Sequence, residues 1–60
     1  MMASMSEQRR FLANIDKVSS LRLNMIAEEL MSIIRNNQAT SSDIQFHEEV
    51  CKEIFKRTKE

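Results

Sequence analysis

Apolar residues recur every three or four positions in the last third of the chain, which is the spacing of one helix face. Phe46, Val50, Ile54 and Phe55 share that face, while glutamate and lysine side chains occupy the opposite side. The pattern predicts an amphipathic helix over about 42–58. We expect its four large apolar residues to form the core of the folded chain.

The start of this helix carries the usual polar signals. Ser42 is a suitable N-cap, with Gln45 three residues later to complete a capping box. Asp43 places a negative charge in the first turn, where the helix macrodipole favours it, and basic residues fill the last turns. Both ends therefore agree with the apolar pattern between them.

A second amphipathic segment precedes it. Ser4 followed by Glu7 resembles a capping box, so a helix should begin near position 6. From there to Asn36 the chain has neither glycine nor proline, and apolar residues keep a helical spacing: Phe11, Ile15, Val18, Ile26, Leu30, Ile33 and Ile34. We expect one helix over about 6–36, roughly 45 Å long, and disorder over 1–5.

The alternative is a break near Ser19 and Ser20, where either serine could cap a second piece. The N-terminal piece would then be a short separate helix. Folded back on the others, it would close a small monomeric bundle.

The segment 36–41 reads as a linker. Asparagine at its start tolerates the left-handed conformation that ends many helices, and connections this short join antiparallel neighbours. The sequence therefore predicts an all-α fold, an antiparallel helical hairpin, within a single small domain over 1–60.

The longer predicted helix carries more apolar surface than the shorter one can cover. Around Leu30 its apolar residues extend over more than half of the helix circumference, which a two-helix hairpin cannot bury. We therefore expect another protein, or a second copy of the chain, to cover one face of the long helix. The predicted partner-binding residues are Ile15, Val18, Leu23, Ile26, Leu30 and Ile33.

Composition narrows the function classes. Sixty residues bury only about 60% of the unfolded surface, and Cys51 is the sole cysteine, so no internal disulfide adds stability. Nine basic and nine acidic residues cancel, which disfavours a nucleic-acid or anionic-lipid partner. No stretch is apolar enough for a membrane span. These features favour a cytoplasmic protein.

The residues that could support chemistry are few. His47 and Cys51 have the spacing of the two histidines in H-E-x-x-H, but the chain has no further histidine or cysteine. The adjacent acidic pairs point about 100° apart on a helix, and a chain without glycine has no phosphate-binding loop. We expect no catalytic, cofactor-binding or metal site, no small-molecule substrate and no enzymatic activity.

A second interpretation is a homodimeric helical regulator that binds nucleic acid. Arg9, Arg10 and Lys17 could lie on one side of the first helix. Three positive charges without aromatic stacking residues provide little support for such a site.

The segment Asp43-Ile44-Gln45-Phe46 resembles the opening of the second helix in the small helical-hairpin co-chaperones of type III secretion needle subunits. The overall layout of a long helix, a short linker and a shorter helix is also similar. The resemblance implies a bacterial cytoplasmic protein that pairs with a larger helical chaperone and helps keep a needle subunit monomeric. Members of that family often have glycine in the linker, which this chain lacks.

Overall fold

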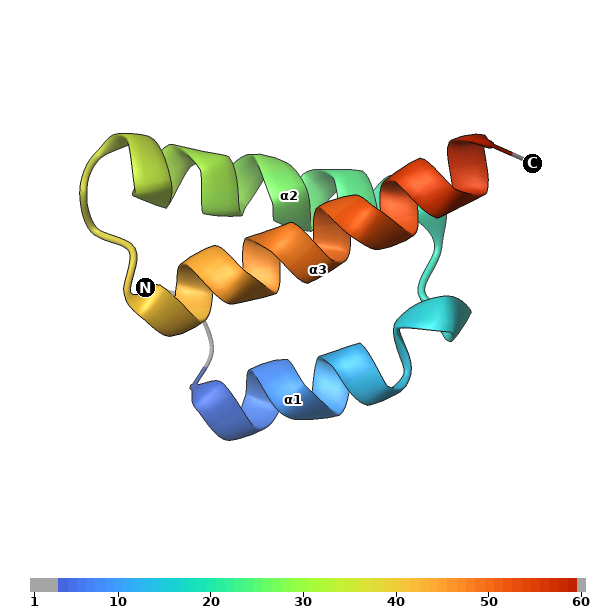
Figure 1. Cartoon of the computed structure of the whole chain (residues 1–60), viewed down its shortest axis with the longest axis horizontal. Coiled ribbons are helices and arrows are strands. Elements are labelled where there is room, and N and C mark those ends of the chain that lie inside the picture. Colours follow the sequence, from blue (N-terminus) through green and yellow to red (C-terminus); the bar gives the residue numbers. More distant parts are fainter. Residues whose placement is uncertain (1–3, 60) are drawn as a thin grey trace.

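The computed structural model describes residues 4–59. Within that part all regular secondary structure is helical, which confirms the predicted all-α class. Figure 1 shows the elements in chain order: α1 (Met5–Ala13), a short 3₁₀ helix η1 (Ile15–Lys17), α2 (Ser20–Arg35) and α3 (Ser41–Thr58).

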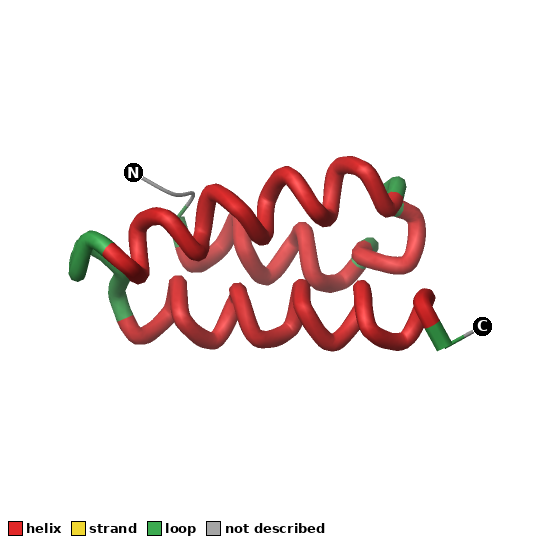
Figure 2. Tube along the Cα trace, turned by 90° about the horizontal axis from the view of Figure 1, so that it is seen from above, coloured by secondary structure: helices red, strands yellow, loops and turns green. Residues whose placement is uncertain are grey.

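The helix α3 lies between the other two (Figure 1). It runs antiparallel to α2, as the predicted hairpin requires, and α1 packs against its other side. In the view from above, α1 lies behind α2 and α3, so the three helices form a small bundle (Figure 2). The separate N-terminal helix, the alternative interpretation of the sequence, is therefore present.

The prediction of one helix over 6–36 is wrong. The Ser4 side chain caps α1 as expected by accepting a hydrogen bond from the backbone of Glu7, but α1 ends at Ala13. Between there and α2 the chain reads NIDKVS, in which polar side chains compete for backbone groups and β-branched residues crowd the helical turn. Ser19 then caps α2 by accepting from the N–H of Arg22 at 3.2 Å.

The predicted disorder of 1–5 is also partly wrong, because Met5 begins α1 and Ser4 caps it. Positions 1–3 of that prediction lie outside the described residues.

The end of α2 uses asparagine in place of glycine. Asn37 has a φ of 58°, in the left-handed region. Its N–H donates to the carbonyl of Ile34 at 3.1 Å, and the N–H of Gln38 donates to Ile33 at 2.8 Å. This pair of bonds is the Schellman motif, which satisfies the last carbonyls of α2 and turns the chain toward α3.

The start of α3 lies two residues before the predicted one. The N-cap is Thr40 rather than Ser42, and Asp43 rather than Gln45 completes the capping box. The Thr40 hydroxyl accepts from the N–H of Asp43 at 3.2 Å, while the Asp43 carboxylate accepts from the N–H of Thr40 at 3.1 Å. The side chain of Ser42 is thereby left to bind α1.

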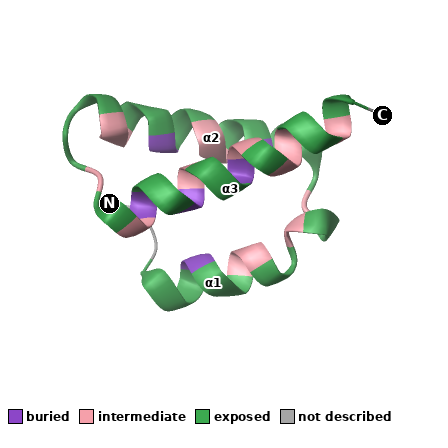
Figure 3. Cartoon of the chain, viewed as in Figure 1, coloured by how far each residue is buried: buried purple, intermediate pink, exposed green. Residues whose placement is uncertain are grey.

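The apolar core lies where α2 and α3 face each other (Figure 3). Leu23, Leu30 and Val50 are fully buried, and Phe46 is 5% exposed. Partly buried side chains pack around these four, and they come from α1, η1, the residue after η1 and both long helices: Phe11, Leu12, Ile15, Val18, Ile26, Ala27, Ile33 and Ile54.

This core overturns the predicted partner surface. Leu23 and Leu30 are entirely inside the chain, so they do not face a partner. The other four residues assigned to a partner pack against the same core: Ile15, Val18, Ile26 and Ile33. The reason is that α3 buries this face of α2, while side chains of α1 and η1 pack around the same cluster.

The predicted hairpin core is closer to the structure. Phe46 and Val50 are buried and Ile54 is half-buried against them, but Phe55 is 61% exposed. The prediction for Phe55 is wrong because it lies one position beyond Ile54, about 100° further around the helix.

Candidate functional site

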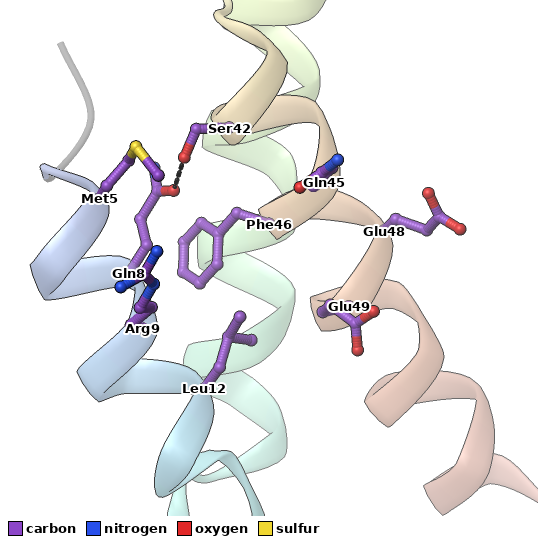
Figure 4. A pocket seen from close by; sticks show the side chains of 9 residues that line it. All are labelled: Met5, Gln8, Arg9, Leu12, Ser42, Gln45, Phe46, Glu48 and Glu49. Atoms are coloured by element: carbon purple, nitrogen blue, oxygen red, sulfur yellow. Dashed lines mark hydrogen bonds between the residues drawn. The ribbon is translucent and has the colours of Figure 1, made fainter.

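A buried polar cluster joins the N-terminal ends of α1 and α3. Gln8 is only 4% exposed. Its amide Nε2 donates to Oδ1 of Asp43 at 2.7 Å, and the hydroxyl of Ser42 donates to its Oε1 at 2.6 Å. The latter bond is drawn in Figure 4. A glutamine on a surface helix gives no sign of this in the sequence, because its partners are 34 and 35 residues away.

The same cluster controls the charge state of Asp43. The hydrogen bond from the backbone N–H of Thr40 lowers the pKa of this carboxyl below its ordinary value. Burial acts in the opposite direction, and the bond from Gln8 adds to the lowering. Asp43 is therefore a carboxylate at neutral pH, which suits its place in the first turn of α3.

Arg57 ties the opposite end of the bundle together. Its Nη2 donates to the carbonyl oxygens of Ile15 at 3.0 Å and Asp16 at 3.3 Å, and its Nη1 donates to the hydroxyl of Ser20 at 3.2 Å. Its Nε pairs with Glu53 at 3.0 Å. The Ile15 carbonyl also accepts from the backbone N–H of Val18 at 3.1 Å, so the guanidinium adds a second bond there and links α3 to the segment between α1 and α2.

A groove of about 390 Å³ lies between α1 and α3 (Figure 4). Phe46 extends from α3 toward α1 and lies beside Leu12. The ring of Phe11 meets Phe46 edge to face, with centroids 5.4 Å apart. The aromatic rings at this groove already pack against each other, and Gln8 and Ser42 are hydrogen-bonded to each other at its polar end. We therefore infer that the groove belongs to the packing between α1 and α3 and is not a binding site.

A second groove, of about 420 Å³, lies between α2 and α3. From here on it is called the α2–α3 groove. Ala27 and Met31 line it from α2, and His47 and Cys51 line it from α3. Polar and charged side chains complete the lining: Asn24, Glu28, Ser32 and Arg35. All the residues that line this groove come from α2 and α3, and none comes from α1.

The apolar character of α3 continues beyond this groove. Ile44 and Phe55 are 49% and 61% exposed. They lie seven residues before and four residues after Cys51, so all three share one stripe of the helix. The Nζ of Lys59 lies 5.0 Å from the centre of the Phe55 ring and covers part of it.

His47 and Cys51 do lie close together, as their spacing predicts. The cysteine Sγ is 3.5 Å from Nε2 and 4.0 Å from Nδ1 of the imidazole. Across residues 4–59, however, no group of three histidine, cysteine, aspartate or glutamate side chains gathers to hold a metal ion. The pair is part of the groove wall.

The three basic residues of the nucleic-acid interpretation do not share a helix. Arg9 and Arg10 are exposed on α1, while Lys17 is exposed in η1, beyond the end of that helix. The expectation that they lie on one side of a continuous first helix is therefore wrong.

Two ion pairs lie along α3. Glu53 and Arg57 pair at a spacing of four residues. Lys52 pairs with Glu49 at 3.5 Å, at a spacing of three residues. Both side chains of this second pair are more than half exposed, so it contributes little stability.

In comparisons with known proteins, no family model, no curated protein and no solved structure matches the chain. None of the helices described in residues 4–59 is both long enough and apolar enough to cross a bilayer.

Proposed function

We propose that this protein is a non-enzymatic interaction module, a small helical adaptor or co-chaperone that binds a helix of another protein in its α2–α3 groove. The observation that carries the proposal is the apolar stripe of Ile44, Cys51 and Phe55. It lies outside the core and beside the groove. An amphipathic helix laid along such a groove would cover the stripe with its own apolar face.

The chemistry of the groove suits a helical protein segment. Met31 is 45% exposed, and its unbranched thioether adapts to the shape of an incoming side chain. Glu28 and Arg35 carry opposite charges two helical turns apart along α2. They would favour a partner with the complementary order of charges and so would set its direction.

This surface replaces the partner-binding residues expected from the sequence, which belong to the core. The resemblance to type III secretion co-chaperones remains a prediction. It would make the partner a helical chaperone of a needle subunit. The homodimeric nucleic-acid regulator gains no support from the arrangement of its basic residues.

The test is photo-crosslinking in an extract of the source cells. The photoreactive analogue p-benzoylphenylalanine is placed at Phe55, which is exposed and whose replacement leaves the core intact. We expect one dominant adduct with a second protein. Adding Ile44→Asp to the same chain should strongly reduce its yield, because a carboxylate would then lie on the apolar stripe.

The control chain carries the photoreactive residue at Arg10, exposed on the outer side of α1. Equal adducts from both positions, or an adduct at Phe55 that is unaffected by Ile44→Asp, would contradict the proposal. Identification of the adduct by mass spectrometry also tests whether the type III secretion resemblance names the partner.

A further inference from the structure

A different apolar surface lies on the outer side of α2, away from the core. Leu21 and Met25 are one helical turn apart and are 72% and 60% exposed. With Ile26, which is half-buried and also packs against the edge of the core, they line a shallow hollow that includes Arg22 and Glu29. We call these five residues the outer α2 face.

The two charges of this face are free to meet another molecule. The ion pairs found among residues 4–59 are Lys52 with Glu49 and Arg57 with Glu53. Neither includes the charged side chains of the outer α2 face, both of which are exposed.

The positions of the charges are symmetric about the apolar pair. Arg22 lies three residues before Met25, and Glu29 lies three residues after Ile26. The midpoint of the two charges therefore falls between Met25 and Ile26, and the charges are about 10 Å apart along the helix at 1.5 Å per residue.

We propose that a second copy of this chain covers the outer α2 face, with the two α2 helices antiparallel across a two-fold axis near Met25. In that arrangement Arg22 of each copy faces Glu29 of the other, and the apolar residues meet at the centre. A two-fold interface must be complementary to itself. The outer α2 face meets this requirement, because opposite charges lie at equal distances on either side of its central apolar pair.

The same charges exclude the parallel arrangement. Parallel helices in register would place Arg22 opposite Arg22 and Glu29 opposite Glu29, which is repulsive at both positions. A binding face for a foreign helix would have no need of this symmetry.

The interface is small. Contact along one helix per copy lies at the low end of specific interfaces, below about 1,200 Å² of total buried surface, so we expect a dissociation constant in the micromolar range. The outer α2 face does not include Ile44 or Phe55, so the dimer does not rest on the proposed use of the α2–α3 groove.

The test is analytical ultracentrifugation of the full chain from roughly 10 µM to 1 mM, the range over which a micromolar dimer forms. The chain has a mass of 7.1 kDa. We expect twice that mass for the wild type at the upper end. Met25→Lys should give the monomer mass, since two ammonium groups would then meet at the axis.

Charge exchange provides the specific readout. Arg22→Glu alone and Glu29→Arg alone should each weaken the dimer about tenfold or more, because two attractive pairs become repulsive. An equimolar mixture of the two variants should dimerise again, since every facing pair is then of opposite sign. Lys56→Glu, an equal charge change on α3, is the control and should leave the dimer unchanged.

Circular dichroism of each variant checks that the helices form. A wild type that stays monomeric at the highest concentration would overturn the proposal, including the case in which a foreign protein takes this face. So would a dimer that survives Met25→Lys, or a mixture of the two charge variants that fails to regain the dimer.

Discussion

The helix α3 packs against α2 through buried aliphatic side chains, but against α1 through one aromatic contact and polar ties at both ends. Leu23, Leu30 and Val50 are fully buried in the first of these interfaces, the seam between α2 and α3. In the second seam, Gln8 binds Asp43 at one end and Arg57 binds the turn after α1 at the other.

This difference indicates what each of the two helix interfaces contributes to the fold. Apolar burial gives most of the free energy of folding but is indifferent to small shifts in register. Hydrogen bonds from buried polar groups add less energy but are costly when misaligned. We infer that the seam between α2 and α3 provides stability, whereas the seam between α1 and α3 fixes where the short helix sits.

The largest effect should come from the apolar seam. Leu23→Ala should lower the free energy of unfolding by about 2–5 kcal/mol, through lost burial and the cavity left behind. A chain of 60 residues has only about 3–9 kcal/mol in total, so the variant should be partly or wholly unfolded. Urea denaturation followed by circular dichroism measures the change.

Leu21→Ala is the matched control, two residues away on the same helix and 72% exposed. It should change the stability by less than about 0.5 kcal/mol. If both substitutions cost the same, the two residues would not differ in burial as the structure shows.

Removing the shared polar group of the second seam should cost less. Asp43→Ala deletes half of the α3 capping box and the acceptor of the Gln8 amide, with an expected loss of about 1–3 kcal/mol. Glu48→Ala, an exposed carboxylate further along α3, should have little effect. Similar losses for the two variants would argue against a special role of Asp43.

Part of the Asp43 contribution should depend on pH. Its pKa is lowered in the folded chain, so its stabilising effect is fully present above the unfolded-state value and is lost as the pH falls through the folded-state value. The stability difference between the wild type and Asp43→Asn should therefore shrink as the pH is lowered from 5 to below about 3. A difference that stays constant over this range would show that the charge of Asp43 is not involved.

The smallest effect should follow from loss of the Arg57 tie. Arg57→Met keeps the aliphatic stem but removes the donors to the carbonyls of Ile15 and Asp16, at a cost of about 1 kcal/mol. The loss should be local: relative to the wild type, amide hydrogen exchange should accelerate more in α1 and η1 than in α2. Lys56→Met is the control, and uniform acceleration across all three helices would contradict a local role.

Local sequence signals located most of the helical structure. The cap at Ser4, the helix end near Asn36 and the amphipathic stretch of α3 all depend on neighbours within a few positions, so they could be predicted. The break after Ala13 is not marked by such a signal. Neither glycine nor proline is present there, although the polar and β-branched residues that follow are themselves poor helix formers.

The candidate sites were harder to predict because they depend on how the helices pack against one another. A helical pattern shows which residues are apolar, but not which neighbour buries them. The spacing therefore predicts a partner contact for Leu23 and Leu30, although the chain itself encloses them. The exposed residues Phe55 and Met25 carry the same apolar signal as the core, and spacing alone does not separate the two groups.

The sequence by itself determined that this chain forms capped amphipathic helices with more apolar surface than two of them could bury, because those properties arise from residues three or four positions apart. The tertiary structure decided that a third helix closes the core and that Gln8 and Arg57 hold it in place. Those contacts join residues 34 to 42 positions apart. Their energy becomes available only after the chain has folded back on itself.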